Sequence, residues 1–167
     1  RYYLTPSYTT AKQGEAEALE LLMKVVASGT TSRLYGRVVM EQKLASSAGG
    51  WYSGAGRDSG RIGLAAIAAD GVTLERVEEA LDAVLRDVRA NGISEAELER
   101  AKAAYLAEYV YESDNQATLA RRYGWALVVG ATIADVEEWP VRLRNVTVDN
   151  VKAVAERYLD IRHSVTG

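Results

Sequence analysis

The sequence contains no cysteine and only one histidine, His163, among its 167 residues. Without cysteine the chain can form no disulfide framework, thiol nucleophile or thiolate metal site. With one histidine it cannot contain a His-x-x-Glu-His metal motif, and a Ser-His-Asp triad would depend wholly on His163. The acidic residues Glu95, Glu97 and Glu99 alternate at the start of an expected helix, where they complement the helix dipole rather than define a metal site. We therefore expect no catalytic residue and no metal ligand in this chain.

A marked excess of charge is also missing. Lys and Arg number 20 against 23 Asp and Glu, and the isoelectric point is near 5.3. This balance argues against a nucleic-acid partner and against a basic helix lying on a membrane surface. No apolar run reaches the roughly 18 residues of a membrane-spanning helix. The glycines between Gly49 and Gly56 open no helix directly, so they do not fit a phosphate-binding loop.

What the sequence has is a hydrophobic fraction of 48% and clear periodicity. This length and composition favour a single domain over residues 1–167 with one core. The opening Arg1–Pro6 lacks both an initiator methionine and the layout of a signal peptide, so we expect a fragment of a longer protein.

The apolar pattern alternates between strand and helix spacing. Strands are expected at Tyr2–Leu4, in a hairpin formed by 45–56 and 62–68, and from Ile161 to Thr166. Helical spacing covers 14–29, 30–44, 73–91, 94–106, 117–129 and 147–158, with a short piece after Ile133 that Pro140 should interrupt. Ser94 and Glu97 have the spacing of a capping box, and Thr73 and Thr147 are expected N-caps. The order predicts an α+β fold with an antiparallel-rich sheet covered on one face by helices.

Two aromatic features invite functional interpretations. Arg121, Arg122 and Trp125 could stack on bases and bind phosphates, but a solvated helix face explains them more simply. Trp51 and Tyr52 in the hairpin could line a ligand pocket, although packing in a core or interface is the simpler interpretation.

One longer pattern points to a family. Gly29-Thr30-Thr31-Ser32-Arg33-Leu34-Tyr35, followed by Glu41-Gln42-Lys43-Leu44-Ala45, resembles the second domain of pitrilysin/insulinase-type zinc peptidases, in which a hairpin follows. The similarity continues through the strand 61–69, the segment 93–98 and the C-terminal residues 164–167. It spans nearly the whole chain in the same order of elements.

The resemblance implies that this chain is the non-catalytic C-terminal domain of a bacterial member. Its fold would be that of one half of a mitochondrial processing peptidase-like metallohydrolase. The zinc would lie in the missing N-terminal half, which would be the main partner, and this domain would shape a chamber for the peptide substrate. A second subunit or a homodimer could complete the chamber, and the family favours the periplasm over the cytoplasm.

The resemblance also suggests contact residues. Some second domains carry an Arg and, seven positions later, a Tyr that bind the substrate backbone near the zinc. At the register set by Leu44-Ala45 these positions fall on Val39 and Ser46, so the pair is missing unless Arg37 substitutes. Trp51, Tyr52, Arg37 and Ser46 are therefore the expected chamber or interface residues, together with the predicted helix that carries Arg37.

Two alternatives remain open. The chain could belong to a catalytically inactive scaffold or assembly subunit of the same fold, like the core subunits of respiratory complexes. It could instead be an unrelated peptide-binding module that adds an extended peptide to the edge of its sheet.

Overall fold

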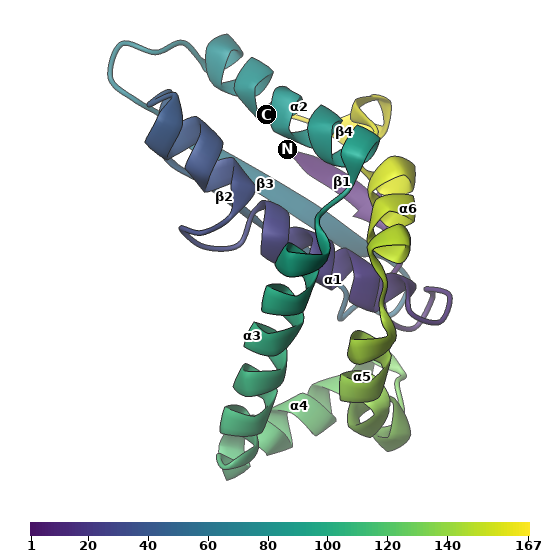
Figure 1. Cartoon of the computed structure of the whole chain (residues 1–167). Helices are drawn as coiled ribbons and strands as arrows, with labels where there is room; N and C mark the ends of the chain where they lie inside the picture. Colours follow the sequence, from purple (N-terminus) through teal and green to yellow (C-terminus); the bar gives the residue numbers. More distant parts are fainter.

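The computed structural model describes residues 1–167 and contains one four-stranded sheet with helices on one of its faces. In chain order the elements are β1 (Tyr2–Thr5), α1 (Glu15–Val26), η1 (Tyr35–Glu41), β2 (Ala45–Ser53), β3 (Gly60–Ala68), α2 (Leu74–Asn91), α3 (Glu95–Ser113), α4 (Gln116–Val129), α5 (Ile133–Asn145), α6 (Val148–Tyr158), η2 (Ile161–His163) and β4 (Ser164–Val165). The predicted α+β class and the one-sided helical layer are confirmed (Figure 1).

The sheet is antiparallel throughout, with strand order β2-β3-β1-β4. The predicted hairpin, β2 and β3, forms the two longer strands of the sheet, with Trp51 opposite Gly63. Strand β1 pairs with the other edge of β3. Burial alternates along β1: Tyr3 and Thr5 point into the core, whereas Tyr2 and Leu4 are exposed. This alternation is expected for a strand with one face covered and one face open.

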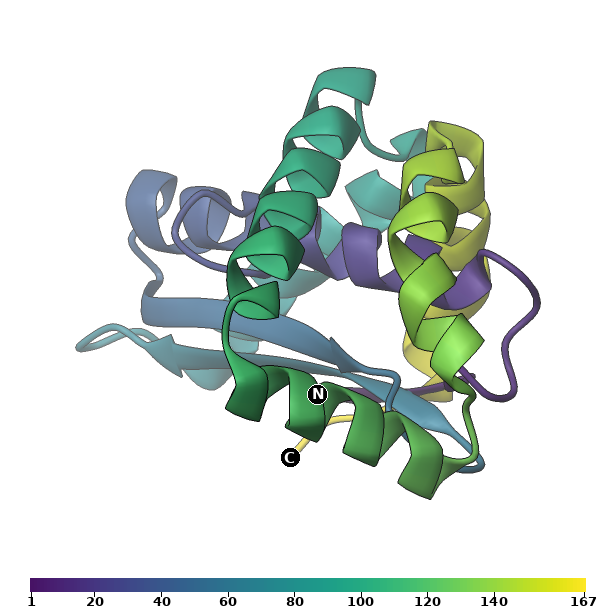
Figure 2. The same cartoon turned by 90° about the horizontal axis from the view of Figure 1, so that it is seen from below.

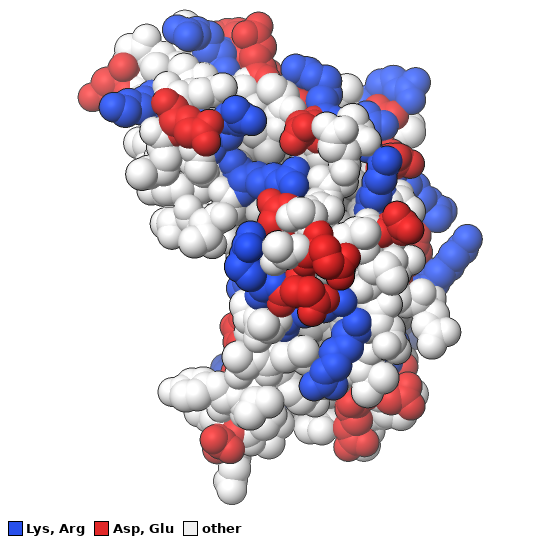
Figure 3. Space-filling model, in the orientation of Figure 1, with Lys and Arg blue, Asp and Glu red and all other residues white.

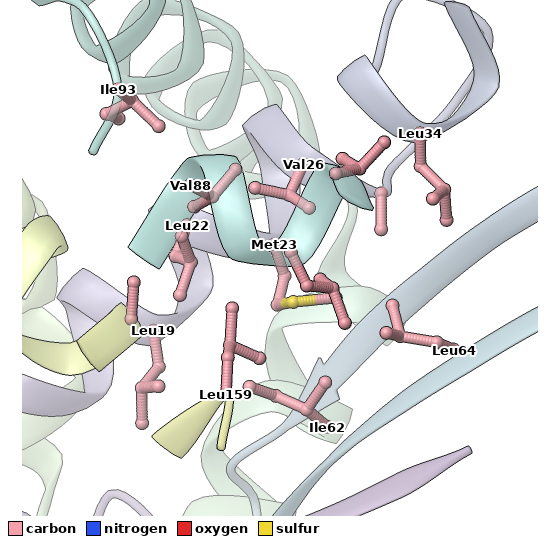
Figure 4. Close-up of a cluster of buried hydrophobic side chains, with 14 of the residues drawn as sticks. Leu19, Leu22, Met23, Val26, Leu34, Ile62, Leu64, Val88, Ile93 and Leu159 are labelled. Carbon is pink, nitrogen blue, oxygen red and sulfur yellow. The ribbon is translucent and has the colours of Figure 1, made fainter. Parts of the chain in front are cut away.

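Helices α1, α2 and α6 cover the inner face of the sheet, and the core lies between the two layers (Figure 1). Leu22 and Val26 of α1 belong to the same buried cluster as Ile62 of β3, and Leu159 at the end of α6 lies beside Ile62 (Figure 4). All four side chains are almost fully buried. Each contributes about 1.5–3 kcal/mol through removal of apolar surface from water.

The other helices extend away from the sheet. The C-terminal half of α3, all of α4 and α5 together form a helical arm over residues 105–145, with α4 crossing between the ends of α3 and α5 (Figures 1 and 2). No residue of α4 is buried. None of the helices is both long and apolar enough to span a membrane.

Three predicted elements differ in the structure. The helix predicted over 30–44 is π-helical over Tyr35–Glu41, and it ends before Lys43, whose left-handed conformation (φ 54°) turns the chain into β2. Pro140 does not interrupt α5. The final strand is only two residues long, since a 3-10 turn occupies Ile161–His163.

The tolerance of α5 for Pro140 has a local explanation. Proline removes one backbone donor from a helix interior. The start of α5 is held by the capping box of Thr132 and Asp135. The Arg142 side chain also donates to the backbone carbonyl of Asp135 at 2.7 Å, so hydrogen bonds from side chains support the turns that precede the proline.

Candidate binding surfaces

No group of three His, Cys, Asp or Glu side chains is placed to hold a metal ion. His163 is exposed on the 3-10 turn before β4. Two candidate binding surfaces are present: an uncovered sheet face and a cleft beside the helical arm.

The uncovered face exposes several large apolar side chains, together with Arg61 opposite Leu4. We call it the outer sheet face and define it by Tyr2, Leu4, Trp51, Ile67 and Val165, which are 50%, 73%, 45%, 65% and 73% exposed. Strand alternation places them opposite the core. Contiguous apolar residues on an open surface typically mark a site of protein interaction.

Trp51 is the largest side chain of the outer sheet face, and its position depends on a glycine. A Cβ on Gly63, its cross-strand neighbour, would lie 2.6 Å from the Trp51 ring. The indole therefore lies flat over the β3 backbone, and the Tyr2 ring meets it edge-on at 6.2 Å between centroids. This arrangement fixes a rigid aromatic platform on the exposed sheet.

The structure separates the four residues expected at the chamber or interface. Trp51 is on the outer sheet face, but Tyr52 points the other way, and its hydroxyl donates to the Pro6 carbonyl at 2.8 Å. Arg37 lies on η1 and pairs with Glu41 at 3.4 Å between charged atoms. Ser46 stands at a bulge near the start of β2 and donates to the Ile67 carbonyl at 3.3 Å. Only Trp51 thus belongs to the apolar patch.

The second surface is a cleft of about 970 Å³ between α1 and the helical arm. Its lining comes mostly from the loop before α1, from α1 itself and from α3, α4 and α5, with Ala55 of the β2–β3 loop and the turn between α4 and α5. In one wall Glu17 of α1 pairs with Arg142 of α5 at 2.6 Å, and the two side chains are only 3% and 17% exposed. Removing one partner of such a buried pair leaves an uncompensated charge, which costs about 3–5 kcal/mol. The pair fixes α5 against α1.

Glu20 of α1 lines this cleft. Its carboxylate accepts from the Tyr8 hydroxyl and, at 3.1 Å, from the Trp139 indole, which also donates to the Tyr8 oxygen at 2.9 Å. Burial raises the pKa of Glu20 above the usual range. Burial, followed by the Glu20 charge, raises the pKa of Tyr8 and of Tyr105 as well. The Glu20 carboxylate has no cationic partner within ion-pair distance.

Aromatic rings line the same cleft. Trp139 stacks on Tyr109 with 5.5 Å between ring centroids, and Tyr105 meets Trp139 edge-on at 6.3 Å. The Arg122 guanidinium lies 4.2 Å from the centre of the Tyr109 ring and pairs with Glu112 at 2.6 Å. This pairing ties α4 to α3.

Sequence reasoning did not find this cleft. Tyr8, Glu20 and Trp139 are far apart in the chain, and each alone is typical of an ordinary surface or core position. The one indication was the cluster of Arg121, Arg122 and Trp125 on α4, which was interpreted as a solvated helix face. Trp125 is indeed 58% exposed, but both arginines and Trp125 also line the cleft.

Comparison with known proteins identifies the family and the fold. The family model described as the peptidase M16 inactive domain matches residues 2–105, which is more than half of the chain. The chain belongs to the peptidase M16 inactive domain family. This confirms the expected relationship to the non-catalytic domain of pitrilysin-type peptidases. No curated protein sequence matches the chain.

Solved structures share the fold at low sequence identity. A protease from Helicobacter pylori is similar with a TM-score of 0.88 and 20% identity; 97% of this chain is covered, but only 38% of that one. An inactive peptidase domain from Bordetella parapertussis has a TM-score of 0.84 and 22% identity, with 97% and 85% covered. The periplasmic protease PqqL from Escherichia coli has a TM-score of 0.75 and 19% identity, with 95% and 17% covered. This chain therefore spans well under half the length of two of these proteins.

Proposed function

We propose that this chain is the C-terminal, non-catalytic domain of a zinc metalloendopeptidase and that its outer sheet face forms one wall of the chamber that holds the peptide substrate. The observation that carries the proposal is the apolar outer sheet face on a domain of an inactive peptidase family. The zinc and the residues that activate water would belong to the N-terminal half of the parent protein. The periplasm is the compartment we favour, because one similar structure is a periplasmic protease.

The open sheet face suits this role better than the helical side does. A chamber wall has to meet an extended peptide or a second domain over a broad and rigid area. The outer sheet face offers Trp51 fixed over Gly63 and flanked by Tyr2, and rigid aromatic side chains are the common anchors of binding surfaces. The inner face is filled by α1, α2 and α6 and cannot serve.

The test uses the full-length parent protein. Bound zinc per chain is measured together with cleavage of a long unstructured peptide, with and without a chelator. Trp51→Ser should lower kcat/KM about tenfold or more, because a central aromatic anchor contributes at least 1–2 kcal/mol to binding, and should leave the zinc content unchanged. Tyr111→Ser is the matched control, since Tyr111 is 81% exposed on the helical arm.

Each outcome is decisive. Chelator-sensitive cleavage that Trp51→Ser reduces and Tyr111→Ser leaves alone supports the proposal. A parent protein without zinc or activity would favour the alternative of a scaffold subunit of the same fold. Equal activity of both variants would mean that the outer sheet face is not the chamber wall.

A further inference from the structure

The four strands of the sheet contain a single charged residue, Arg61 of β3. It is exposed and lies between Leu4 of β1 and Ser53 of β2 in the register of the sheet. The next residue, Ile62, is fully buried in the core, so strand alternation places the Arg61 side chain on the same side as the outer sheet face. This face thus combines large apolar side chains with one positive charge.

The Arg61 guanidinium has no hydrogen-bond or ion-pair partner, and the strands around it contain no acidic residue. Other arginines of the chain are paired: Arg33 with Glu97, and Arg142 with Glu17. On the helical side, Figure 3 shows Lys and Arg side chains interspersed with Asp and Glu over α2 and α6. The sheet side offers no such balance, and its positive charge is left to a partner.

The chemistry of that partner follows from the cost of covering a charge. A guanidinium that loses its water is destabilised unless it gains an opposite charge. An occupant with apolar side chains alone would leave Arg61 unpaired, and a basic occupant would repel it. A carboxylate near Arg61 would instead accept charge-assisted hydrogen bonds from the guanidinium. Charge complementarity therefore favours an occupant that carries an acidic group beside its apolar side chains.

The register of the sheet sets the spacing between the two kinds of contact. Trp51 and Tyr2 both lie opposite Gly63, which is two residues from Arg61 along β3. Two residues of a strand span about 6.6 Å. In an extended peptide lying along β3, the side chains that face the sheet are also two positions apart. An apolar side chain over the Trp51 ring would therefore bring the residue two positions away to Arg61.

We propose that the outer sheet face selects peptide segments in which a bulky apolar residue and an acidic residue are two positions apart. Trp51 and Tyr2 contact the apolar side chain, and Arg61 pairs with the carboxylate. This inference rests on the proposed role of the outer sheet face as a wall of the peptide chamber. It adds the class of substrate to that role and makes Arg61 the residue that determines the preference for charge.

Cleavage of matched peptides by the full-length parent protein tests the proposal. Three long, unstructured peptides share one Leu-Ser-Xaa segment and carry Glu, Gln or Lys at Xaa. A second set has the reversed segment, Xaa-Ser-Leu, because a peptide can lie along β3 in either direction. We expect kcat/KM to fall in the order Glu, Gln, Lys in at least one set. Each step should be about threefold, which is the size of effect that partly exposed ion pairs produce.

Variants of Arg61 assign the preference to its charge. Arg61→Glu should reverse the order, so that the Lys peptide becomes the best of the three substrates, and Arg61→Lys should retain the order because the charge remains. Arg61 is exposed, so neither change should prevent folding. Arg76→Glu is the matched control. Arg76 is exposed in the first turn of α2, on the helical side, and the same change of charge there should leave the order as it is.

The proposal is overturned if Arg61→Glu leaves the order of the peptides unchanged in both sets. It is equally overturned if Arg76→Glu changes the order as much, since total charge would then be the cause.

The role as chamber wall fails in a different way, which Trp51→Ser reports. If Trp51→Ser lowers kcat/KM while Arg61→Glu has no effect on the order, the outer sheet face is the chamber wall but Arg61 does not select its substrate. If neither variant has an effect, or if the parent protein cleaves none of the peptides, both the proposed function and this inference are wrong.

Discussion

At the scale of single residues, Glu97 joins two parts of the chain. Its carboxylate accepts from the Ser94 backbone at 2.8 Å, which completes the predicted capping box of α3. It also accepts two hydrogen bonds of 2.7 Å from the Arg33 guanidinium, which lies 64 residues earlier. The Arg33 hydrogen bonds, followed by those from Ser94, lower the pKa of Glu97 to about 2 despite partial burial.

Glu97→Gln should therefore destabilise the chain in a manner that depends on pH. Because the pKa is lower in the folded state than the ordinary value of 4.5, the charged carboxylate contributes its full stability above about pH 4.5. That contribution is lost as the pH falls towards about 2. We expect Glu97→Gln to lower the free energy of unfolding by about 1–2 kcal/mol at neutral pH, after allowance for solvent screening. Urea denaturation at several pH values measures it.

Glu95→Gln provides the control. Glu95 is the first residue of α3, is exposed, and has no hydrogen-bond or ion-pair partner through its side chain. Its effect should stay within about 0.5 kcal/mol at every pH. If the difference between the Glu97→Gln variant and the unaltered chain did not shrink on acidification, the Arg33–Glu97 pair would not be its source.

At the scale of elements, the contact between the end of α1 and β2 depends on Gly50. The Gly50 amide donates to the Ala27 carbonyl at 2.9 Å. A Cβ at this position would lie 2.5 Å from the Gly63 carbonyl oxygen and 3.1 Å from the Ala27 Cβ. Position 50 thus lies too close to β3 and to the residue that ends α1 for any side chain.

Gly50→Ala should lower the free energy of unfolding by about 1–3 kcal/mol, because the added methyl meets backbone atoms that cannot move independently. Thermal and urea unfolding measure the loss. Gly36→Ala on η1 is the matched control: nothing lies within 4 Å of its Cβ, and alanine in a helical segment should be neutral or stabilise by up to about 1 kcal/mol. Equal effects of the two variants would contradict this account of the α1–β2 contact.

Elements whose ends depend on local chemistry were predictable from the sequence. The capping box of Ser94 and the N-cap at Thr147 both form. Helix α4 ends where expected, before Gly130, which has the left-handed conformation that glycine favours. The position of Thr73 was correct, although its side chain makes no cap hydrogen bond. The extent of η1 was not predictable, because the left-handed Lys43 depends on how η1 packs against β2.

The two candidate surfaces also differ in how far the sequence predicts them. Strand alternation alone places the consecutive residues Trp51 and Tyr52 on opposite faces of the sheet, so their different surroundings could have been predicted. The cleft could not, because it needs α5 to bring Trp139 and Arg142 back to α1. Contacts over more than a hundred residues leave no periodic signal in a sequence.

At the scale of the whole molecule, the fold has two layers, the sheet and the helices, and the outer face of the sheet is exposed. The helices cover the inner face of the sheet, while Leu4 and Ile67 remain 73% and 65% exposed on the outer sheet face. An open apolar sheet favours association with any complementary surface, including another copy of the same chain. In the absence of the other half of a peptidase, self-association is the expected consequence.

The chain alone should therefore show a weight-average mass that rises with concentration, at values of the order of 100 µM, in sedimentation experiments. The double variant Leu4→Lys with Ile67→Lys should stay monomeric, because charged side chains on a sheet surface oppose its pairing. Its free energy of unfolding should change by less than about 1 kcal/mol, since both positions are exposed. Val110→Lys with Tyr111→Lys, on equally exposed positions of the helical arm, should associate as the unaltered chain does. If the arm variant became monomeric and the sheet variant did not, the helical arm rather than the outer sheet face would be the surface through which this domain meets its partners.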